Sequence, residues 1–311
     1  MMEELFRLTE DVKDLLETDR TERLAQLLAE SHPADVSRAL RELPVERQTT
    51  VFRLLSGEQA GSVLHEMDDQ TLLELVRALD EVELSGILEQ MPTDNAAQVV
   101  DELSEEQAEK VLDLMKEEKS EEVQELLEYG EKTAGRIMSP EFVAVHEEMS
   151  VAQALDHVRK SASSEHAFYL YVVDDHDHLV GVVPLRRLIT ADPATPIRLI
   201  RHEDVVSVTP ETDQEEVARL VAKYNLLAVP VVDGDRRLLG TVTVDDVIDV
   251  IQQEATEDIQ RFGGVAGDET VLDPAQAVFT KRLVWRFINL ATAILAASVI
   301  GLFEGSIRSL A

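Results

Sequence analysis

The chain has 311 residues, enough for two or three domains, and no cysteine, which excludes disulfides, thiolate metal sites and cysteine nucleophiles. Its 62 acidic residues outnumber its 29 basic residues and give a formal net charge of -33. Nucleic-acid surfaces need Lys and Arg to neutralise phosphates, so this balance excludes a general nucleic-acid partner. It suits a protein that handles cations, or one from a salty cytoplasm.

A twelve-residue repeat runs through the first part of the chain, and eight units follow one another without a gap from Asp35. Turn formers and helix caps, such as Pro44 and Ser56, fill the last three positions of most units. The fifth and ninth positions carry the apolar residues Ala39, Val51, Val63, Leu75, Ile87, Val99, Val111 and Val123, and Leu43, Leu55, Met67, Leu79, Met91, Leu103, Met115 and Leu127. Each unit predicts a two-turn helix and a turn. Helices this short are unstable alone, so we expect residues 1–130 to stack into a superhelix whose Leu and Met stripe is core.

Two similar α/β units are predicted at 137–199 and 200–252. In the first, a strand at 142–145 leads to a helix from Ser150 and then to a hairpin. In the second, a strand at 205–208 leads to a helix after Pro210 and another hairpin. The segments 173–189 and 232–248 align without a gap at an offset of 59 residues.

The first hairpin contains Asp174, Asp175, His176, Asp177 and His178 in succession. These side chains are typical metal ligands. They lie between two apolar strands, where a polar turn is required, so we interpret them as a hairpin turn.

The opening IMSP (137–140), the VVD hairpins and the closing G-x-V-T-x-x-D-V (240–247) resemble a tandem pair of CBS (cystathionine β-synthase) domains. The resemblance implies a flat regulatory module, commonly a homodimer, that binds adenine nucleotides such as ATP or metal ions. In such units the closing Thr and Asp typically serve ribose and phosphate. The second unit has Thr243 and Asp246, whereas the first has Pro184 and Arg187, so at most one nucleotide site is expected in each chain.

An amphipathic helix is predicted at 242–264. Six acidic residues and no Lys or Arg lie between Asp245 and Asp258, so ion pairs within this stretch cannot relieve the repulsion. The helical wheel places Val244, Val247, Ile248, Ile251, Ala255 and Ile259 on one face and Asp245, Asp246, Asp249, Glu254 and Glu257 on the opposite one. The acidic face is either solvated or responsive to a cation.

An apolar run of 21 residues extends from 283 to 303. As a helix it measures about 31 Å, against a hydrocarbon core of about 30 Å, so we interpret it as transmembrane. Its uninterrupted part, 290–303, is 14 residues long and also fits a buried core helix. Lys281, Arg282 and Arg286 at its N-terminal end predict a cytoplasmic location for residues 1–280 and insertion in the cell membrane. The N-terminus lacks the features of a signal peptide, which agrees with this orientation.

This order of elements, with the motifs TDQEEVARL (212–220), TVDDVIDV (243–250), EATEDI (254–259) and the final GLFEGSI, resembles the MgtE family of magnesium transporters and channels. The resemblance implies an all-α superhelix, an α/β tandem CBS pair that forms a homodimer, an acidic plug helix at 253–264 and one transmembrane helix. It also implies that Mg²⁺ bound among the helical domain, the CBS pair and the plug helix favours a compact, closed state. The family's pore needs later membrane helices, so we expect a regulatory fragment or a short member.

The same resemblance carries over a set of sensor carboxylates, whose oxygen ligands suit Mg²⁺. These residues are Asp94, Glu215, Asp246, Asp249, Glu254, Glu257 and Asp258, with Asp213 and Glu216 as neighbours that could share the load. Gln98 and Asn225 stand where family members can have an acid, so some sites are expected to be weaker or missing here.

No serine-hydrolase, P-loop, HExxH or dinucleotide motif is present, so we do not expect an enzyme. The alternative function is a membrane-anchored CBS adaptor that senses adenine nucleotides through its second unit.

Overall fold

The computed structural model describes residues 2–18, 20–161 and 168–262, together with 287, 290–295 and 297–298. Two compact units are formed by residues 1–247 and 248–311. The first unit begins with ten helices among the described residues. They are α1 (Met2–Glu17), α2 (Thr21–Glu30), α3 (Pro33–Arg41), α4 (Val45–Phe52), α5 (Gly57–His65), α6 (Asp69–Val76), α7 (Glu81–Leu88), α8 (Thr93–Asp101), α9 (Glu105–Leu114) and α10 (Glu117–Glu128).

The twelve-residue repeat is confirmed by the positions at which α3 to α10 begin. Their N-cap residues are His32, Pro44, Ser56, Asp68, Asp80, Pro92, Ser104 and Lys116, each twelve residues after the one before. The side chains of Ser56, Asp68 and Ser104 accept a backbone N–H from the first turn of their helix. Polar caps therefore set the helix boundaries at equal steps.

Alternate helices of this array pack on each other, α1 on α3, α3 on α5, α5 on α7 and α7 on α9, with α4 on α6 and α8 on α10. The fifth position of each unit supplies the core, as at Val51, Val63 and Leu75, whose exposed fraction is 0%. Met67, Met91 and Met115 of the ninth position are also buried. The predicted superhelix with a Leu and Met core is thus confirmed.

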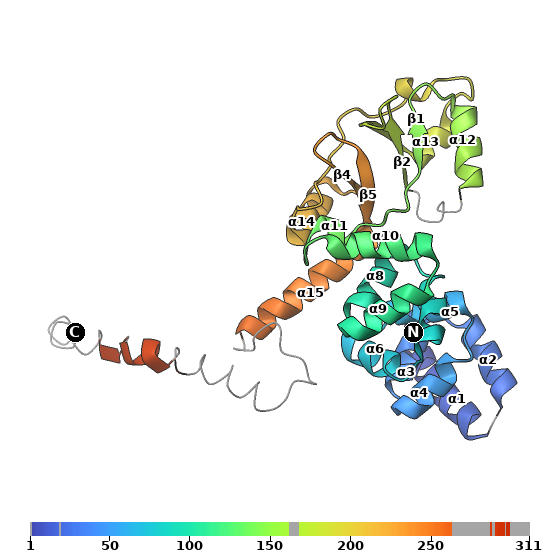
Figure 1. Ribbon diagram of the computed structural model, residues 1–311, viewed down its shortest axis with the longest axis vertical. Helices are drawn as coiled ribbons and strands as arrows, with labels where there is room; N and C mark the ends of the chain where they lie inside the picture. The colour runs from blue at the N-terminus through green and yellow to red at the C-terminus, as the bar shows by residue number, and fades with distance from the viewer. Residues whose placement is uncertain are drawn as a thin grey trace. The chain divides into compact units, whose positions relative to one another are not determined.

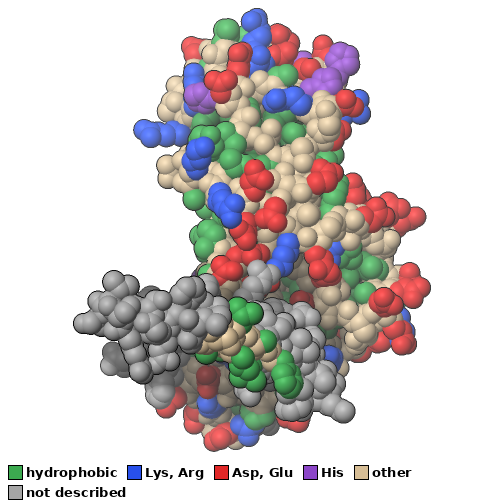
Figure 2. Space-filling view, turned by 90° about the vertical axis from the view of Figure 1, so that its left-hand side faces the viewer, with side chains coloured by type: hydrophobic (Ala, Val, Ile, Leu, Met, Phe, Trp, Pro, Cys, Tyr) green, Lys and Arg blue, Asp and Glu red, His purple; other side chains and the backbone are tan. Residues whose placement is uncertain are grey.

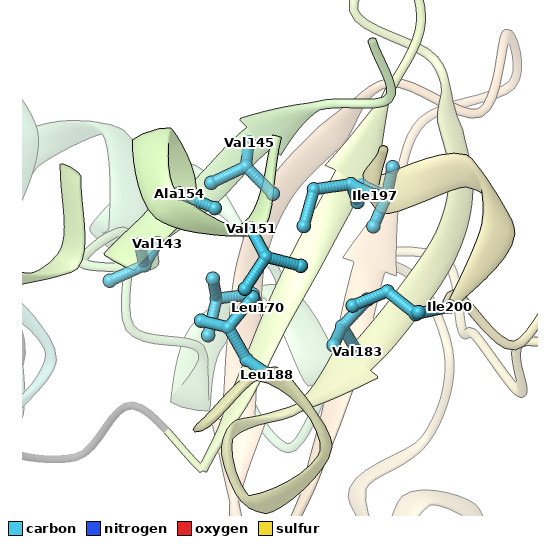
Figure 3. Close-up of a cluster of buried hydrophobic side chains, with 10 residues drawn as sticks. Val143, Val145, Val151, Ala154, Leu170, Val183, Leu188, Ile197 and Ile200 are labelled. Atoms are coloured by element: carbon cyan, nitrogen blue, oxygen red, sulfur yellow. The ribbon is translucent and has the colours of Figure 1, made fainter. Parts of the chain in front are cut away.

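The first α/β repeat follows α10 and consists of α11 (Ala134–Ile137), β1 (Ala144–His146), α12 (Val151–Lys160), β2 (Tyr169–Val173), β3 (Leu179–Pro184), α13 (Leu185–Thr190) and the 3-10 helix η2 (Ile197–Leu199). Its three strands form one sheet in the order β1, β2, β3, with β1 parallel to β2 and β3 antiparallel to it. Val151, Leu170, Val183, Leu188 and Ile197 lie in its buried core, where helix and strand side chains face one another (Figure 3). The last helix of the array, α10, packs on α8 and on α11, and α11 packs on α14 (Gln214–Tyr224) and β5 (Leu238–Thr243), so these helices connect the array to the repeats (Figure 1).

The second repeat consists of α14 (Gln214–Tyr224), β4 (Ala228–Val232), β5 (Leu238–Thr243) and the start of α15 (Val244–Phe262). The strand predicted at 205–208 was wrong, because only Val208 pairs, through a single bridge to Val231. In the first repeat the backbone N–H groups of Tyr171 and Glu147 extend the pairing by donating to Val143 and Val173. The corresponding positions of the second repeat are Pro230 and Pro210, which have no N–H to donate.

Each repeat pairs its hairpin with a segment that crosses from elsewhere in the chain. Ser139 pairs with Thr241 of β5, and His202 pairs with Val182 of β3. The preceding residue of each strand is glycine, and a Cβ atom at Gly240 would lie 2.7 Å from the Ser139 carbonyl oxygen. Glycine is therefore required at Gly240 for the segment that follows the helical array to reach the second repeat.

The acidic helix exists as α15, but its helical wheel was partly wrong. Asp246, which the wheel places on the solvated face, is 9% exposed, and Val250 is also buried. Ile248, Ile251 and Ile259 of the predicted apolar face are exposed. A wheel records the period of one helix and carries no information on the neighbours that cover it.

The predicted transmembrane segment at 283–303 lies mostly outside the described residues. Where that segment is described it is helical, and Leu290, Ile294 and Leu295 are exposed. Within the described part of the chain, no helix has both the length and the apolar character needed to cross a membrane.

Candidate metal centre

Asp94 is the first half of a buried pair of carboxylates. It lies in the first turn of α8, it is 6% exposed, and its Oδ1 atom has no hydrogen-bond partner. Burial raises the pKa of Asp94 to about 6, and the charge of Glu141 adds to this shift, while backbone N–H groups and Lys119 oppose it. A buried carboxylate oxygen without a partner is costly in free energy, so this position favours a proton or a cation.

Asp246 is the second half, and it lies in the first turn of α15. Its Oδ2 atom accepts hydrogen bonds from the hydroxyl and the backbone N–H of Thr243. Burial raises the pKa of Asp246 to about 7, and the negative charge of Asp94 is the next cause. Asp246 thus bonds the backbone N–H at the start of its helix, and both buried carboxylates favour a nearby positive charge.

The charge of Asp94 helps to raise the pKa of Asp246, so the two carboxylates lie close enough to repel each other. Their donors are oxygen atoms only, which is the ligand type that Mg²⁺ prefers. Mg²⁺ keeps several waters and needs only one or two carboxylates from the protein. The unpartnered Oδ1 of Asp94 and the mutual repulsion of the pair fit such an ion.

A polar network beside Asp94 joins the helical array to the segment that leads into the first repeat. Lys119 Nζ on α10 donates to Thr93 Oγ1 at 2.7 Å and lies 3.6 Å from Glu141 Oε1. At the other end of α8, Asp101 forms an ion pair with Arg136 of α11 at 2.5 Å. Sequence reasoning missed this network. The only sign of the network in the sequence is that Lys119 is a basic residue in a stretch dominated by Glu.

The acids predicted on α14 have structural partners of their own. Asp213 caps α14 and accepts the backbone N–H of Glu215 at 2.8 Å, and Glu215 forms an ion pair with Arg219 one turn later. Glu216 donates its backbone N–H to the Asp213 carbonyl. Asn225 ends α14 with a φ of 52°, a left-handed conformation that Asn tolerates better than most residues, so the fold accounts for the amide here.

The remaining predicted acids, Asp249, Glu254, Glu257 and Asp258, lie further along α15 in the second unit. Across the described residues, one group of three side chains has its metal-ligating atoms within 4.8 Å of one another, and it consists of Asp174, His176 and His178. Asp94 and Asp246 are the buried carboxylates among the predicted Mg²⁺ residues that the structure describes, and they offer a pair of ligands.

A short-helix array followed by two α/β repeats, with buried carboxylates where they meet, defines a CBS-type regulatory module. The model of the MgtE intracellular N domain matches residues 31–132, and the CBS domain model matches residues 134–194 and 198–253. The chain is 44% identical over 184 residues to the magnesium transporter MgtE of Thermus thermophilus, covering 58% of this chain and 41% of that protein. It is 44% identical over 179 residues to MgtE of Enterococcus faecalis, covering 57% of this chain and 39% of that protein.

Two solved structures share the fold. The soluble part of a magnesium transporter matches with a TM-score of 0.74 at 33% identity, covering 81% of this chain and 99% of that one. The cytosolic domain of the Mg²⁺ channel MgtE in complex with ATP matches with a TM-score of 0.74 at 38% identity, covering 78% and 99%. The chain belongs to the MgtE family, with a helical N domain followed by a CBS pair. It spans about two-fifths of the length of the curated relatives it matches.

Proposed function

We propose that this chain is the Mg²⁺-sensing and gating part of an MgtE-type magnesium channel or transporter. In this proposal Mg²⁺ bound between the N domain, the second CBS repeat and α15 favours a compact state in which an attached pore is closed. Membership of the MgtE family supports Mg²⁺ as the sensed cation. The transported ion would also be Mg²⁺.

The observation that carries the proposal is the buried pair of Asp94 and Asp246. Asp94 belongs to the N domain and Asp246 to the end of the second CBS repeat, so the pair links two parts of the chain that are distant in sequence. Without a cation their repulsion opposes this arrangement, and a bound divalent ion would replace that repulsion with attraction to both carboxylates. A ligand shifts such an equilibrium only by its differential affinity, and saturation at 100 times the dissociation constant contributes about 2.7 kcal/mol per site.

The acids of α15 extend the proposal. Asp249, Glu254, Glu257 and Asp258 belong to the motifs through which the sequence resembles the MgtE plug helix. Asp213, Glu215 and Glu216 would contribute less, because the first caps α14 and the second is paired with Arg219. Several weak sites would together give a steep response to cytoplasmic Mg²⁺.

The test is a Mg²⁺ series in which both the thermal unfolding of the full chain and its limited proteolysis near Gly130 are measured. We expect Mg²⁺ to raise the unfolding temperature and to protect the linker in the wild type. Asp94→Asn/Asp246→Asn should remove most of the Mg²⁺ response. The matched control, Asp113→Asn/Glu118→Gln, changes two exposed acids of the same array and should retain it. An equal response in both double variants would contradict the proposed site.

The acids of α15 have a test of their own. Asp249→Asn/Glu254→Gln/Glu257→Gln should make the compact state less dependent on Mg²⁺ without unfolding the chain. If protection rises as steeply in this triple variant as in the wild type, α15 carries an ordinary solvated acidic face.

We also propose that the CBS pair forms a homodimer and that the segment at 283–303 inserts into the cell membrane, with residues 1–280 on the cytoplasmic side. Large apolar side chains of the repeats are exposed, including Ile189, Leu199 and Leu227, and they would be covered by a second copy. Light scattering should give the mass of a dimer, and a monomer at every Mg²⁺ concentration would exclude it.

A second candidate function is the binding of an adenine nucleotide by the second CBS repeat. The ATP complex of a related cytosolic domain favours it. Thr243 and Asp246 are the residues through which the chain resembles nucleotide-binding CBS units, and here they bond to each other. Calorimetry with ATP should give at most one site per chain, and that site should be lost in Asp246→Ala. Two equivalent sites would show that Pro184 and Arg187 do not prevent binding in the first repeat.

A further inference from the structure

The turn between β2 and β3 holds three metal-ligating side chains that the proposed Mg²⁺ function does not use. Asp174, His176 and His178 each offer a ligand atom, and the three atoms lie within 4.8 Å of one another. The prediction that this segment is a hairpin turn is confirmed. What the sequence did not reveal is that the turn gathers these three side chains on one side.

We propose that this turn is a surface binding site for a divalent transition-metal cation such as Zn²⁺, held by the carboxylate of Asp174 and the imidazoles of His176 and His178. Imidazole with carboxylate is a donor set for Zn²⁺, Ni²⁺ or Cu²⁺, whereas Mg²⁺ prefers oxygen ligands alone. The site therefore takes a different class of cation from the pair at Asp94 and Asp246.

The distances between the ligand atoms of the turn fit a bound metal ion. Asp174 Oδ2 and His178 Nδ1 are 3.1 Å apart. Two ligand atoms at about 2.0–2.1 Å from one ion are separated by about 2.8–3.0 Å in octahedral geometry and about 3.3–3.4 Å in tetrahedral geometry. The His176 ring stacks against the His178 ring with centroids 5.7 Å apart, which leaves it beside the same point.

The backbone holds the carboxylate in place. Asp174 Oδ1 accepts the backbone N–H groups of His176 and His178 at 2.8 and 3.0 Å, so Oδ2 is directed toward the ring of His178. His176 is exposed and Asp174 and His178 are partly exposed, so a cation in solution has access. Figure 2 shows histidine side chains, in purple, at the surface near the top of the view.

The second repeat shows that the fold does not need the two histidines. Its equivalent turn has Asp233 in the place of Asp174, with the same two backbone hydrogen bonds at 2.9 and 2.8 Å. The residues that replace His176 and His178 there are Asp235 and Arg237. The left-handed residue is also shared, with φ values of 63° at Asp177 and 64° at Arg236. Turn formation thus accounts for the aspartate and leaves both imidazoles unexplained.

The proposal is tested by titrating the full chain with Zn²⁺ in the presence of saturating Mg²⁺, which occupies the oxygen-only sites. We expect one Zn²⁺ per chain by calorimetry, and visible absorption bands when Co²⁺ is used instead. His176→Gln/His178→Gln should lower the Zn²⁺ affinity at least tenfold and abolish the Co²⁺ bands. The control, His65→Gln/His157→Gln, removes two imidazoles elsewhere and should leave both readouts unchanged.

A second variant guards against misfolding. His176→Asn/His178→Asn removes both imidazoles but keeps a polar turn and the backbone N–H groups that Asp174 accepts, so it should unfold close to the wild-type temperature in the absence of metal and still lose the Zn²⁺ site. Zn²⁺ affinity that is unchanged in either double variant would overturn the proposal, as would full displacement of Zn²⁺ from the wild type by Mg²⁺.

Discussion

The two CBS repeats have the same hairpin and the same turn. They differ at the third residue after the end of the hairpin. In the second repeat this residue is Asp246, buried and bonded to Thr243. In the first repeat it is Arg187, which is exposed and whose Nη1 atom lies 3.0 Å from Nε2 of His202. The two repeats thus share one fold, but this position is a buried acidic residue in the second and an exposed basic residue in the first.

The largest expected effect on stability comes from replacing the glycine that lies beside the crossing segment in each repeat. Gly240→Val should lower the free energy of unfolding by about 3 kcal/mol, because its Cβ would meet the backbone oxygen of Ser139. Gly181→Val should cost less, since its Cβ would lie 3.0 Å from the backbone oxygen of His202, compared with 2.7 Å from that of Ser139 at Gly240, and its nearest contact is a side chain, that of Arg201. Denaturant unfolding of both variants measures the difference, and equal costs would mean that the two crossing segments are held alike.

The second largest effect is expected when the charged side chain at the position that differs between the repeats, Asp246 or Arg187, is neutralised. Without Mg²⁺ at pH 7.5, Asp246→Asn should stabilise the chain by about 2 kcal/mol, because a buried charge near Asp94 is removed. It should also remove most of the stabilisation that Mg²⁺ provides. Arg187→Asn, its counterpart in the first repeat, should leave the Mg²⁺ response unchanged. A loss of response in both variants would contradict the asymmetry between the repeats.

The raised pKa values of Asp94 and Asp246 predict a pH dependence of the same origin. In the unfolded chain these carboxyls lose their protons near pH 4, whereas in the folded chain they keep them to about 6 and about 7. The folded state therefore binds more protons in this range, so its stability falls as pH rises from about 4 to 7. Compared with Asp94→Asn/Asp246→Asn, the wild type should lose about 1–2 kcal/mol more between pH 6 and 7.5. Saturating Mg²⁺ should reduce this difference in pH dependence between the wild type and the double variant. Identical pH profiles in the absence of Mg²⁺ would exclude a contribution from these two carboxyls.

The smallest effect concerns the strand that the second repeat lacks. Pro230→Val restores the N–H that Tyr171 has in the first repeat, so residue 230 should gain a backbone hydrogen bond. The stability change should stay below about 1 kcal/mol, because the bond is offset by the lost rigidity of proline. Hydrogen exchange should show a protected amide at residue 230. An unprotected amide would mean that the prolines are not what shortens this strand.

Much of the fold could be predicted because it depends on local chemistry. The caps at Ser56, Asp68 and Ser104 act within one turn of helix, so their spacing alone revealed the array. The strand at 205–208 was mispredicted because Pro230, which blocks it, belongs to another strand 22 or more residues away. The burial of Asp246 could not be read from its own helix, since α8 lies some 150 residues earlier in the chain. Only the family resemblance suggested that Asp94 and Asp246 act together.

The equal steps of the helical array constrain how related proteins can change in length. Because each unit adds twelve residues and alternate helices stack, one inserted unit would exchange the two rows of helices, and two units would restore them. We therefore expect insertions and deletions in this part of related genes to come in blocks of about 36 or 72 nucleotides, with the larger block favoured. They should fall before α8, since any block placed after it would separate Asp101 from Arg136 and carry Asp94 away from the second repeat.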